Sequence, residues 1–354
     1  MKPFEELTYL GRLRRMRQFA WNALQAYGMS DLQLKFFRQV GNTLFQVNAT
    51  IPTPTTKTNL YAPGQYLLRI HMPGYQTPAA IELELDWLLS MSQQADLPVP
   101  EPVLTLEGKP YTRAAIPGVP EEHICSVLRW VKGRELKRKT VRPQHYKALG
   151  ELMARLHQHA SHWQPPTSLS KRSYDWDGLF MKEGKGGILS SEAWSLLPPE
   201  YLEPFEIVSK KVKQVMDKLG KGSDVYGLIH GDLGIEANVL FWNGDARVID
   251  FDDSGFGYYI FDLAIVLEDS QDHQIRACFR EALLDGYLRL RPLSEDQIGN
   301  IDLFLAAYAV YWSLFAADAV QYHPEDRKEI CERMYRYFRL VEHYLANHEW
   351  SSLY

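Results

Sequence analysis

Residues 228–257 read LIHGDLGIEANVLFWNGDARVIDFDDSGFG, the most informative stretch of the chain. It contains two short β-rich runs, VLFW and ARVIDF, joined through Asn243-Gly244, the strongest short signal for a β-hairpin. With those two residues at the centre of the turn, Val239 is predicted to pair with Val248. The sequence therefore predicts a two-stranded antiparallel ribbon with a defined register.

The open end of this hairpin gathers side chains that carry oxygen. Continuing the register places Asn238 opposite Ile249, so that Asp250 lies next to Asn238. In such a ribbon, directly opposed residues are about 5 Å apart and diagonal ones about 7–8 Å. Asp232 reaches the same end from the preceding strand, VYGLI, through a glycine turn. Mg²⁺ takes one or two carboxylates plus substrate phosphates, and the remaining acid can accept a proton from an attacking hydroxyl or orient it. These are the components of phosphoryl transfer.

The neighbouring residues allow other interpretations. Asp250 with Asp252 and Asp253 can be a solvated acidic turn, but Asp250 interrupts the apolar run VIDF, where a surface turn has no need to begin. Asp252 and Asp253 are expected to be structural residues of the loop, with metal contact by either as the alternative. His230 lacks the spacing of a zinc site or a catalytic triad, so we expect it to brace the backbone.

A second constellation precedes this stretch. Arg69 lies in the β-rich run QYLLRIH, and Glu84 lies on the apolar face of the helix predicted after it. A carboxylate on such a face needs a partner, and Arg69 is the nearest cation in sequence. Its guanidinium can also present its fork to phosphates, although a plain ion pair is the alternative. The turn at Gly41-Asn42 can either lay backbone N–H groups over phosphates or be an ordinary hairpin.

Several stretches resemble the aminoglycoside phosphotransferase and choline kinase superfamily, and look most similar to the bacterial branch that includes type II homoserine kinase and the stress-response kinases. The matching stretches run in family order over residues 40–265: YLLRIHMPG, IELELDWL, LPVPEPV, LRWVKGREL, LGELMARLHQHA, LIHGDLGIEANVLF and VIDFDDSGFGYYIFDLA.

The resemblance implies a role for each candidate residue. Asp232 would be the catalytic base, and Asn238 and Asp250 would be the Mg²⁺ ligands. Arg69 would take the place of the basic residue that anchors the ATP phosphates, steadied by Glu84.

The same resemblance implies an adenine site and a structural acid. Leu128–Val131, which includes Arg129 and Trp130, would be the hinge whose backbone bonds adenine, and Asp262 would brace the catalytic loop. The chain departs from the family pattern HGDLHPGN, because Asp232 and Asn238 are six steps apart rather than five and Gly234 replaces the second histidine.

The expected fold class is α+β, a two-lobed protein-kinase-like fold with an antiparallel β-sheet N-lobe and a mainly α-helical C-lobe. We predict an N-lobe at 1–131, a hinge at about 128–133, and a C-lobe at 132–354 that contains the catalytic hairpin 228–257.

Within the lobes, residues 32–71 alternate β-rich runs with turn signals, and a helix is expected at about 79–94. Helical spacing predicts another helix at roughly 143–160, and residues 258–350 are mostly helical. The polar, Gly-rich stretch 161–190 is expected to be a long loop.

Composition excludes several classes of partner. A net charge of −5 over 354 residues gives no global attraction to nucleic acid or to an anionic membrane. Three widely separated cysteines suit a reducing cytoplasm. The most apolar stretch, Leu303 to Ala317, falls short of the roughly 18 residues of a membrane span and is expected to be a buried helix. We therefore expect a cytoplasmic protein, and the sequence makes no prediction of its oligomeric state.

The leading hypothesis is an ATP- and Mg²⁺-dependent kinase that phosphorylates a hydroxyl of a small molecule. A nucleotide-binding pseudokinase that serves as a regulatory module is one alternative: the six-residue spacing favours it, and the presence of Asp232, Asn238 and Asp250 argues against it. A Ser/Thr protein kinase is another, but it needs an open groove for a peptide. An aminoglycoside acceptor calls for a strongly acidic pocket, whereas arginines are mixed with the acids in the C-terminal region.

Overall fold

The computed structural model describes residues 2–52, 57–166, 171–181, 192–268, 273–320 and 327–347. The chain separates into two units. Unit 1 comprises Met1–Arg134 with Pro165–Ser170, and unit 2 comprises Glu135–Gln164 with Lys171–Tyr354. The lobes predicted at 1–131 and 132–354 stay a prediction.

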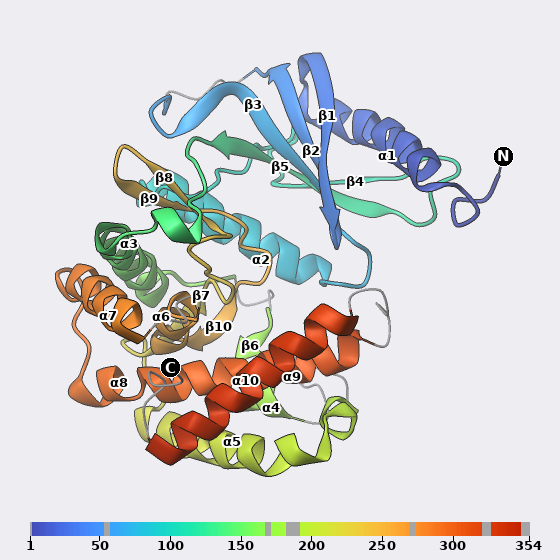
Figure 1. Ribbon diagram of the computed structural model, residues 1–354. Helices are drawn as coiled ribbons and strands as arrows, with labels where there is room; N and C mark the ends of the chain where they lie inside the picture. Colours follow the sequence, from blue (N-terminus) through green and yellow to red (C-terminus); the bar gives the residue numbers. More distant parts are fainter. Residues whose placement is uncertain are drawn as a thin grey trace. The chain divides into compact units, whose positions relative to one another are not determined.

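Unit 1 is built on a five-stranded antiparallel sheet with the strand order β1-β2-β3-β5-β4 (Figure 1). Its strands are β1 Ser30–Val40, β2 Asn42–Thr50, β3 Tyr61–Ile70, β4 Thr112–Ala114 and β5 His123–Val131. The first three strands are the β-rich runs predicted at 32–71.

The two faces of this sheet have different neighbours, because successive side chains of a strand point to opposite sides. Leu68 of β3 and Val127 of β5 are buried in one cluster with Phe19 of helix α1 (Tyr9–Leu24). Arg69 follows Leu68 and therefore faces the other side of the sheet.

Helix α2 (Pro78–Leu89) begins where the sequence marks a start. Thr77 caps it by accepting a hydrogen bond from the Ala80 amide at 3.1 Å, and Pro78 occupies the first turn, where its missing N–H costs nothing. A π-helical turn, Ser90–Gln94, continues the helix. The predicted helix at 79–94 is confirmed, with a change of helix type near its end.

Unit 2 is mostly helical. Its helices are α3 Pro143–His162, α4 Trp176–Phe180, α5 Pro199–Leu219, α6 Tyr259–Val266, α7 His273–Leu288, α8 Glu295–Gly299, α9 Ile301–Ala319 and α10 Arg327–Asn347. A small sheet has the order β6-β10-β7, from Ser173–Tyr174, Gly255–Tyr258 and Tyr226–Ile229.

The prediction of one long loop at 161–190 was wrong for the described part of that stretch, which also contains β6 and α4. Residues 167–170 and 182–190 of the predicted loop lie outside the described residues. The strand β6 has two residues and the helix α4 is one turn long, so neither is long enough to show a period in the sequence. The strand β6 forms because it pairs in parallel with β10.

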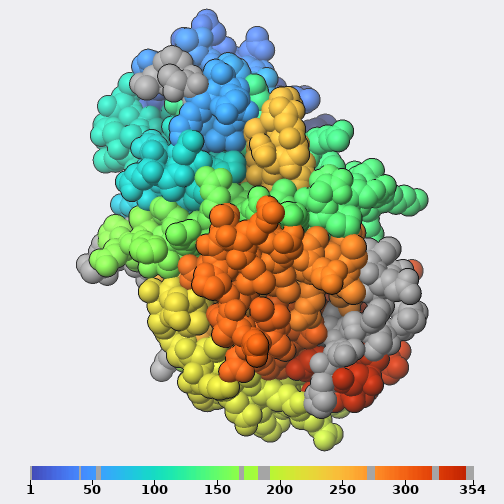
Figure 2. Space-filling model, turned by 90° about the vertical axis from the view of Figure 1, so that its left-hand side faces the viewer, coloured from blue at the N-terminus to red at the C-terminus, as the bar shows by residue number. Residues whose placement is uncertain are grey.

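Helices α3 and α7 approach each other closely through glycine. A Cβ atom added to Gly150 of α3 would lie 2.1 Å from the carbonyl oxygen of Leu283, and one added to Gly286 of α7 would lie 2.1 Å from that of Lys147. The two backbones therefore touch where side chains are absent. The outer surface of α7 is part of the face shown in Figure 2, in orange.

Of the described helices, one is long and apolar enough to cross a membrane by length and composition alone. This helix, α9, has 19 residues, but 78% of its most apolar 18-residue stretch is buried inside the protein. The length argument from Leu303 to Ala317 was therefore wrong, because the helix is longer than the apolar run. The expectation of a buried helix is confirmed.

Candidate active site

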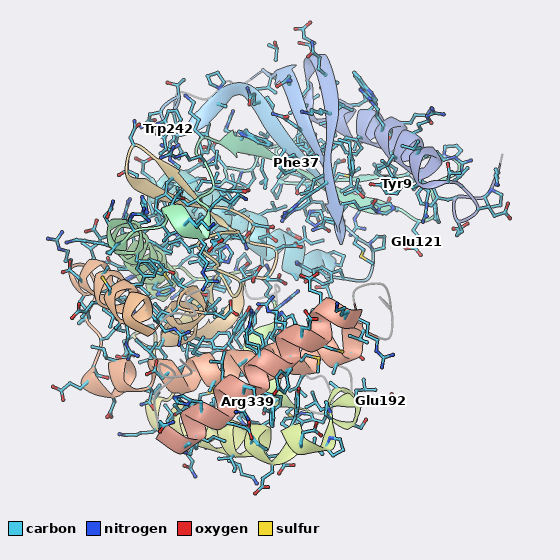
Figure 3. The ribbon with its side chains drawn as sticks, in the orientation of Figure 1. Tyr9, Phe37, Glu121, Glu192, Trp242 and Arg339 are labelled. Carbon is cyan, nitrogen blue, oxygen red and sulfur yellow. The ribbon has the colours of Figure 1, made fainter. Side chains whose placement is uncertain are left out.

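The hairpin predicted at the centre of the chain is present in unit 2, as strands β8 (Val239–Trp242) and β9 (Asp245–Val248). Val239 pairs with Val248 and Trp242 with Asp245, as predicted. Asn243 and Gly244 have φ angles of 52° and 91°, and such a pair of left-handed residues makes the turn that best matches strand twist. Trp242 lies at the tip of this ribbon (Figure 3).

The register continues past the last strand pair. The Ile249 amide donates to the carbonyl oxygen of Asn238 at 3.0 Å. Asn238 Nδ2 donates to Asp232 Oδ2 at 3.1 Å and to the carbonyl oxygen of Asp232 at 2.7 Å. Because the nitrogen Nδ2 makes both of these hydrogen bonds, the oxygen Oδ1 of Asn238 is turned away from Asp232. Oδ1 is therefore the atom of this side chain that could bind a cation.

The extra residue between Asp232 and Asn238 is absorbed by a tight turn. The Gly234 amide donates to the carbonyl oxygen of Asp232 at 3.3 Å, and the amides of Ala237 and Asn238 donate to that of Gly234 at 3.1 and 2.9 Å. The last of these is an i to i+4 bond, which is one helical turn. The longer spacing therefore still brings Asp232 and Asn238 into contact.

Asp250 follows β9 in a left-handed conformation, with φ of 65°. A non-glycine residue in this region costs roughly 1–3 kcal/mol and persists only when the surroundings enforce it. The next four residues form a turn in which the Ser254 amide donates to the carbonyl oxygen of Phe251 at 3.0 Å. Within this turn Asp253 is paired with Arg172 at 2.5 Å.

A buried acid braces the loop that carries Asp232. The two carboxylate oxygens of Asp262 accept hydrogen bonds from the amides of His230 and Gly231, both at 2.8 Å. His157 Nε2 lies 3.2 Å from Asp262 Oδ2. Burial acts to raise the pKa of Asp262, but the hydrogen bond and charge of His157 outweigh it and the pKa is lowered. The structural role expected for Asp262 is confirmed.

His230 also braces the backbone, as expected. Its Nε2 lies 3.0 Å from the carbonyl oxygen of Ile249, which ties the end of β7 to the end of β9. The next residue, Gly231, has φ of 80°, and a Cβ atom there would lie 2.6 Å from the carbonyl oxygen of Asp253. Only glycine fits the turn that delivers Asp232 to the hairpin end.

Asp232 lies in a strongly negative environment. Burial, followed by the charges of Asp253 and Asp250, raises the pKa of Asp232 to about 7. Three acids close to one another make the site chemically suited to a cation, and Arg172 already pairs with one of them, Asp253.

The donor atoms of Asn238 and Asp250 are oxygens, the kind of ligand that Mg²⁺ prefers. No group of three or more His, Cys, Asp or Glu residues in the described part of the chain is arranged to hold a metal ion. Asn238 and Asp250 would supply one amide oxygen and one carboxylate, and Mg²⁺ commonly takes few protein ligands and completes its shell with water and phosphate oxygens.

In unit 1, Arg69 and Glu84 form the predicted ion pair. Arg69 Nη2 lies 2.5 Å from Glu84 Oε1, and the two side chains are 3% and 0% exposed. The pair joins β3, which carries Arg69, to α2, which carries Glu84. Arg69 lies on the sheet face opposite to α1.

The turn at Gly41 connects β1 to β2, and Gly41 has φ of 65°. Asn42 already belongs to β2, and its Oδ1 accepts a hydrogen bond from the Met72 amide at 2.9 Å. The side chain of Asn42 therefore ties the turn to the end of β3. The binding of phosphates by Gly41 and Asn42 stays a prediction.

The predicted adenine segment forms the end of β5. The Arg129 amide donates to the carbonyl oxygen of Glu101, and the Lys132 amide donates to that of Leu60, both at 2.9 Å. Because successive amides of a strand point to opposite sides, the Val131 N–H points the same way as that of Arg129, away from β3.

The side chains of this segment are engaged elsewhere. Arg129 Nε lies 3.3 Å from Glu101 Oε1, and Trp130 contacts Phe37 edge to face at 5.5 Å between ring centroids. The binding of a nucleotide by Arg129 and Trp130 stays a prediction.

Two residues at the site were missed in the sequence. Lys171 and Arg172 contact the loop that follows Asp250. They lie about 80 positions away, in a polar stretch without periodicity, so no local signal marks them.

Comparisons with known proteins agree with this arrangement. The model of the phosphotransferase enzyme family matches residues 55–295. The chain belongs to this family and is a kinase, a phosphotransferase with an alcohol group as acceptor, as expected.

Similar proteins include solved structures and a curated relative. The structure of a microcompartment-associated aminopropanol kinase has a TM-score of 0.74 and 23% identity, covering 93% of this chain and 98% of that one. An amicoumacin kinase in complex with AMP-PNP, Ca²⁺ and amicoumacin has a TM-score of 0.69 and 21% identity, covering 93% and 92%. Hydroxylysine kinase from Bos taurus is 23% identical over 294 residues, 77% of this chain and 75% of that one. The predicted α+β, protein-kinase-like fold is confirmed.

Proposed function

We propose that the protein is an ATP- and Mg²⁺-dependent kinase that transfers the γ-phosphate of ATP to a hydroxyl group of a small molecule. The observation that carries this proposal is the contact of Asp232 with Asn238 at the open end of a hairpin whose other strand leads into Asp250. This brings together an acid for the acceptor and oxygen ligands for the metal.

Asp232 would act on the acceptor hydroxyl. A carboxylate there can accept the hydroxyl proton or orient the oxygen toward phosphorus. A pKa of about 7 suits this task, because a base with a pKa near the working pH is both ionised and able to hold a proton. The hydrogen bond from Asn238 Nδ2 to Asp232 Oδ2 fixes the direction of the carboxylate.

Asn238 and Asp250 would hold Mg²⁺ with the nucleotide phosphates. When bound, the ion neutralises the negative charge of the transferred phosphoryl group. The left-handed backbone at Asp250 and the single orientation of the Asn238 amide would prepare both ligands before binding.

Unit 1 would supply contacts to the nucleotide. Arg69, held by Glu84, would bind phosphate oxygens. The Val131 N–H would bind adenine, since it points away from β3.

The class of acceptor is supported by the relatives. The similar proteins named as kinases act on aminopropanol, amicoumacin and hydroxylysine according to their names, and one of them holds AMP-PNP. We therefore propose an amino alcohol or a hydroxylated amino acid before a sugar or an aminoglycoside.

The test is a screen for ADP release with homoserine, choline, hydroxylysine, 1-amino-2-propanol and methylthioribose, with Mg²⁺ or with EDTA. Turnover of one acceptor, lost in EDTA and in Asp232→Ala, is the expected result. Stabilisation by ATP without turnover of any acceptor would favour a pseudokinase, and labelling of casein by labelled ATP would favour a protein kinase. Wild-type turnover in Asp232→Ala would show that Asp232 is not the base.

A further inference from the structure

The loop Phe251–Ser254 is held by a lysine that is distant in sequence. Lys171 Nζ donates to the carbonyl oxygens of Phe251 and Asp252, both at 3.1 Å, and to Ser254 Oγ at 2.6 Å. Ser254 is fully buried, and its Oγ also donates to the carbonyl oxygen of Phe251 at 2.6 Å. The three acceptors therefore converge on one ammonium group.

The neighbours of Lys171 hold the remaining residue of the loop. Arg172 Nη1 donates to Asp253 Oδ1 at 2.5 Å, and the Tyr174 hydroxyl donates to the carbonyl oxygen of Asp253 at 2.6 Å. The Phe256 amide donates to the carbonyl oxygen of Arg172 at 3.0 Å. Every residue of the loop Phe251–Ser254 thus receives a hydrogen bond from this segment.

These contacts explain why Asp250 can keep its left-handed backbone. A strained conformation needs neighbours that over-determine it, and the residue directly after Asp250 is fixed by Lys171 and by Ser254. The three hydrogen bonds of Lys171 Nζ to this loop end on two carbonyl oxygens and one hydroxyl oxygen, and none of these three acceptors is a carboxylate. Arg172 takes the Asp253 carboxylate instead.

We propose that Lys171 is a positioning residue for a divalent cation at Asn238 and Asp250: it fixes the loop that sets the direction of the Asp250 carboxylate. This inference rests on the proposed function, because it assumes that a metal–nucleotide complex binds there. It assigns to Lys171 a role in metal affinity, separate from any contact with the acceptor.

The test measures Mn²⁺ binding directly, by electron paramagnetic resonance in the presence of ADP, so that no acceptor is needed. Lys171→Met is compared with wild type and with Lys210→Met, a control on α5 whose side chain is 73% exposed. Loss of a residue that orients a metal ligand typically weakens binding about 10- to 100-fold, so we expect at least a tenfold higher Kd for Mn²⁺ in Lys171→Met only. The affinity for ADP in EDTA is expected to stay unchanged.

The wild-type measurement tests the proposed function, and the comparison with Lys171→Met tests the positioning role. Absence of Mn²⁺ binding in wild type would overturn both. Wild-type binding with an equal Kd in Lys171→Met, even with a lower Tm, would overturn the positioning role alone. If Lys171→Met does not fold, Lys171→Arg decides: its planar fork cannot converge on three acceptors as an ammonium does. We expect about a threefold loss of affinity there, by the same loosening of the ligand, and an unchanged Kd would refute the role.

Discussion

Asp232 is an acid whose surroundings oppose its ionisation. Its carboxyl is buried beside Asp253 and Asp250, and its pKa is raised to about 7, whereas an unfolded aspartate titrates near 3.9. Such a group contributes stability that is fully present below about pH 4 and is lost as the pH rises to about 7. The acid proposed for catalysis therefore destabilises the ligand-free protein at neutral pH.

Replacing Asp232 by asparagine is expected to raise stability and abolish turnover. An amide accepts the bond from Asn238 without carrying charge, so the gain at pH 8 should be about 1–3 kcal/mol and should vanish near pH 4. Thermal or denaturant unfolding at several pH values measures it. Asp245→Asn, at the exposed first residue of β9, is the control and should change neither property. A loss of stability in Asp232→Asn at pH 8 would contradict the argument.

The ion pair of Arg69 and Glu84 makes a second prediction for single residues. Arg69→Met leaves the Glu84 carboxylate buried without its cation and should cost about 3–5 kcal/mol. Replacing both, with Arg69→Met and Glu84→Leu, should restore much of the stability but none of the ATP binding. Denaturant unfolding and ATP titration test this, with Arg113→Met of the exposed pair Arg113–Glu122 as the control. Equal losses in the single and double variants would count against a buried-charge penalty.

At the scale of elements, unit 2 depends on one close helix crossing. Helices α3 and α7 touch backbone to backbone at Gly150 and Gly286, where a methyl group would meet carbonyl oxygen at 2.1 Å. Both carbonyl groups belong to the backbone and cannot turn away as a flexible side chain would, so the helices would have to move apart. Helix α3 also carries His157, which contacts Asp262 and so supports the loop of Asp232.

Gly150→Ala and Gly286→Ala are therefore each expected to destabilise the protein by about 3 kcal/mol or more, because overpacking forces backbone shifts. Activity per folded molecule should fall with Gly150→Ala, since α3 supports the catalytic loop. Gly299→Ala in α8 is the matched control: a Cβ there meets open space, so the change should stay within about 0.5 kcal/mol. A tolerated alanine at position 150 would mean that the crossing is softer than its geometry indicates.

At the scale of the whole molecule, the proposal predicts that nucleotide and metal stabilise the protein together. ATP with Mg²⁺ at about 100 times its Kd should add about 2.7 kcal/mol to the free energy of unfolding. ATP with EDTA should add much less, because the carboxylates of Asp232 and Asp250 would face the phosphates without Mg²⁺. Differential scanning fluorimetry measures both, and Asp250→Asn should lose only the Mg²⁺-dependent part. Equal stabilisation by ATP in EDTA would argue against a metal at Asp250.

The amino-acid sequence alone determined the hairpin register, the approach of Asp232 to the open end of the hairpin and the pairing of Arg69 with Glu84. These features depend on turn chemistry and on the periods of strands and helices, which act over a few residues. The same local reasoning misjudged the described part of residues 161–190, where the two residues of β6 and the single helical turn of α4 are too short to show a period.

The tertiary structure alone decided which residues hold the loop after Asp250 and how the pKa of Asp232 shifts. Lys171 lies 80 residues from Phe251, and no local preference specifies that contact. The contact requires the long stretch of chain between the two residues to close, at an entropic cost, and the parallel pairing of β6 with β10 lies beside it. Burial and the clustering of acids are likewise properties of the packed chain, because the unfolded chain leaves each carboxyl in water.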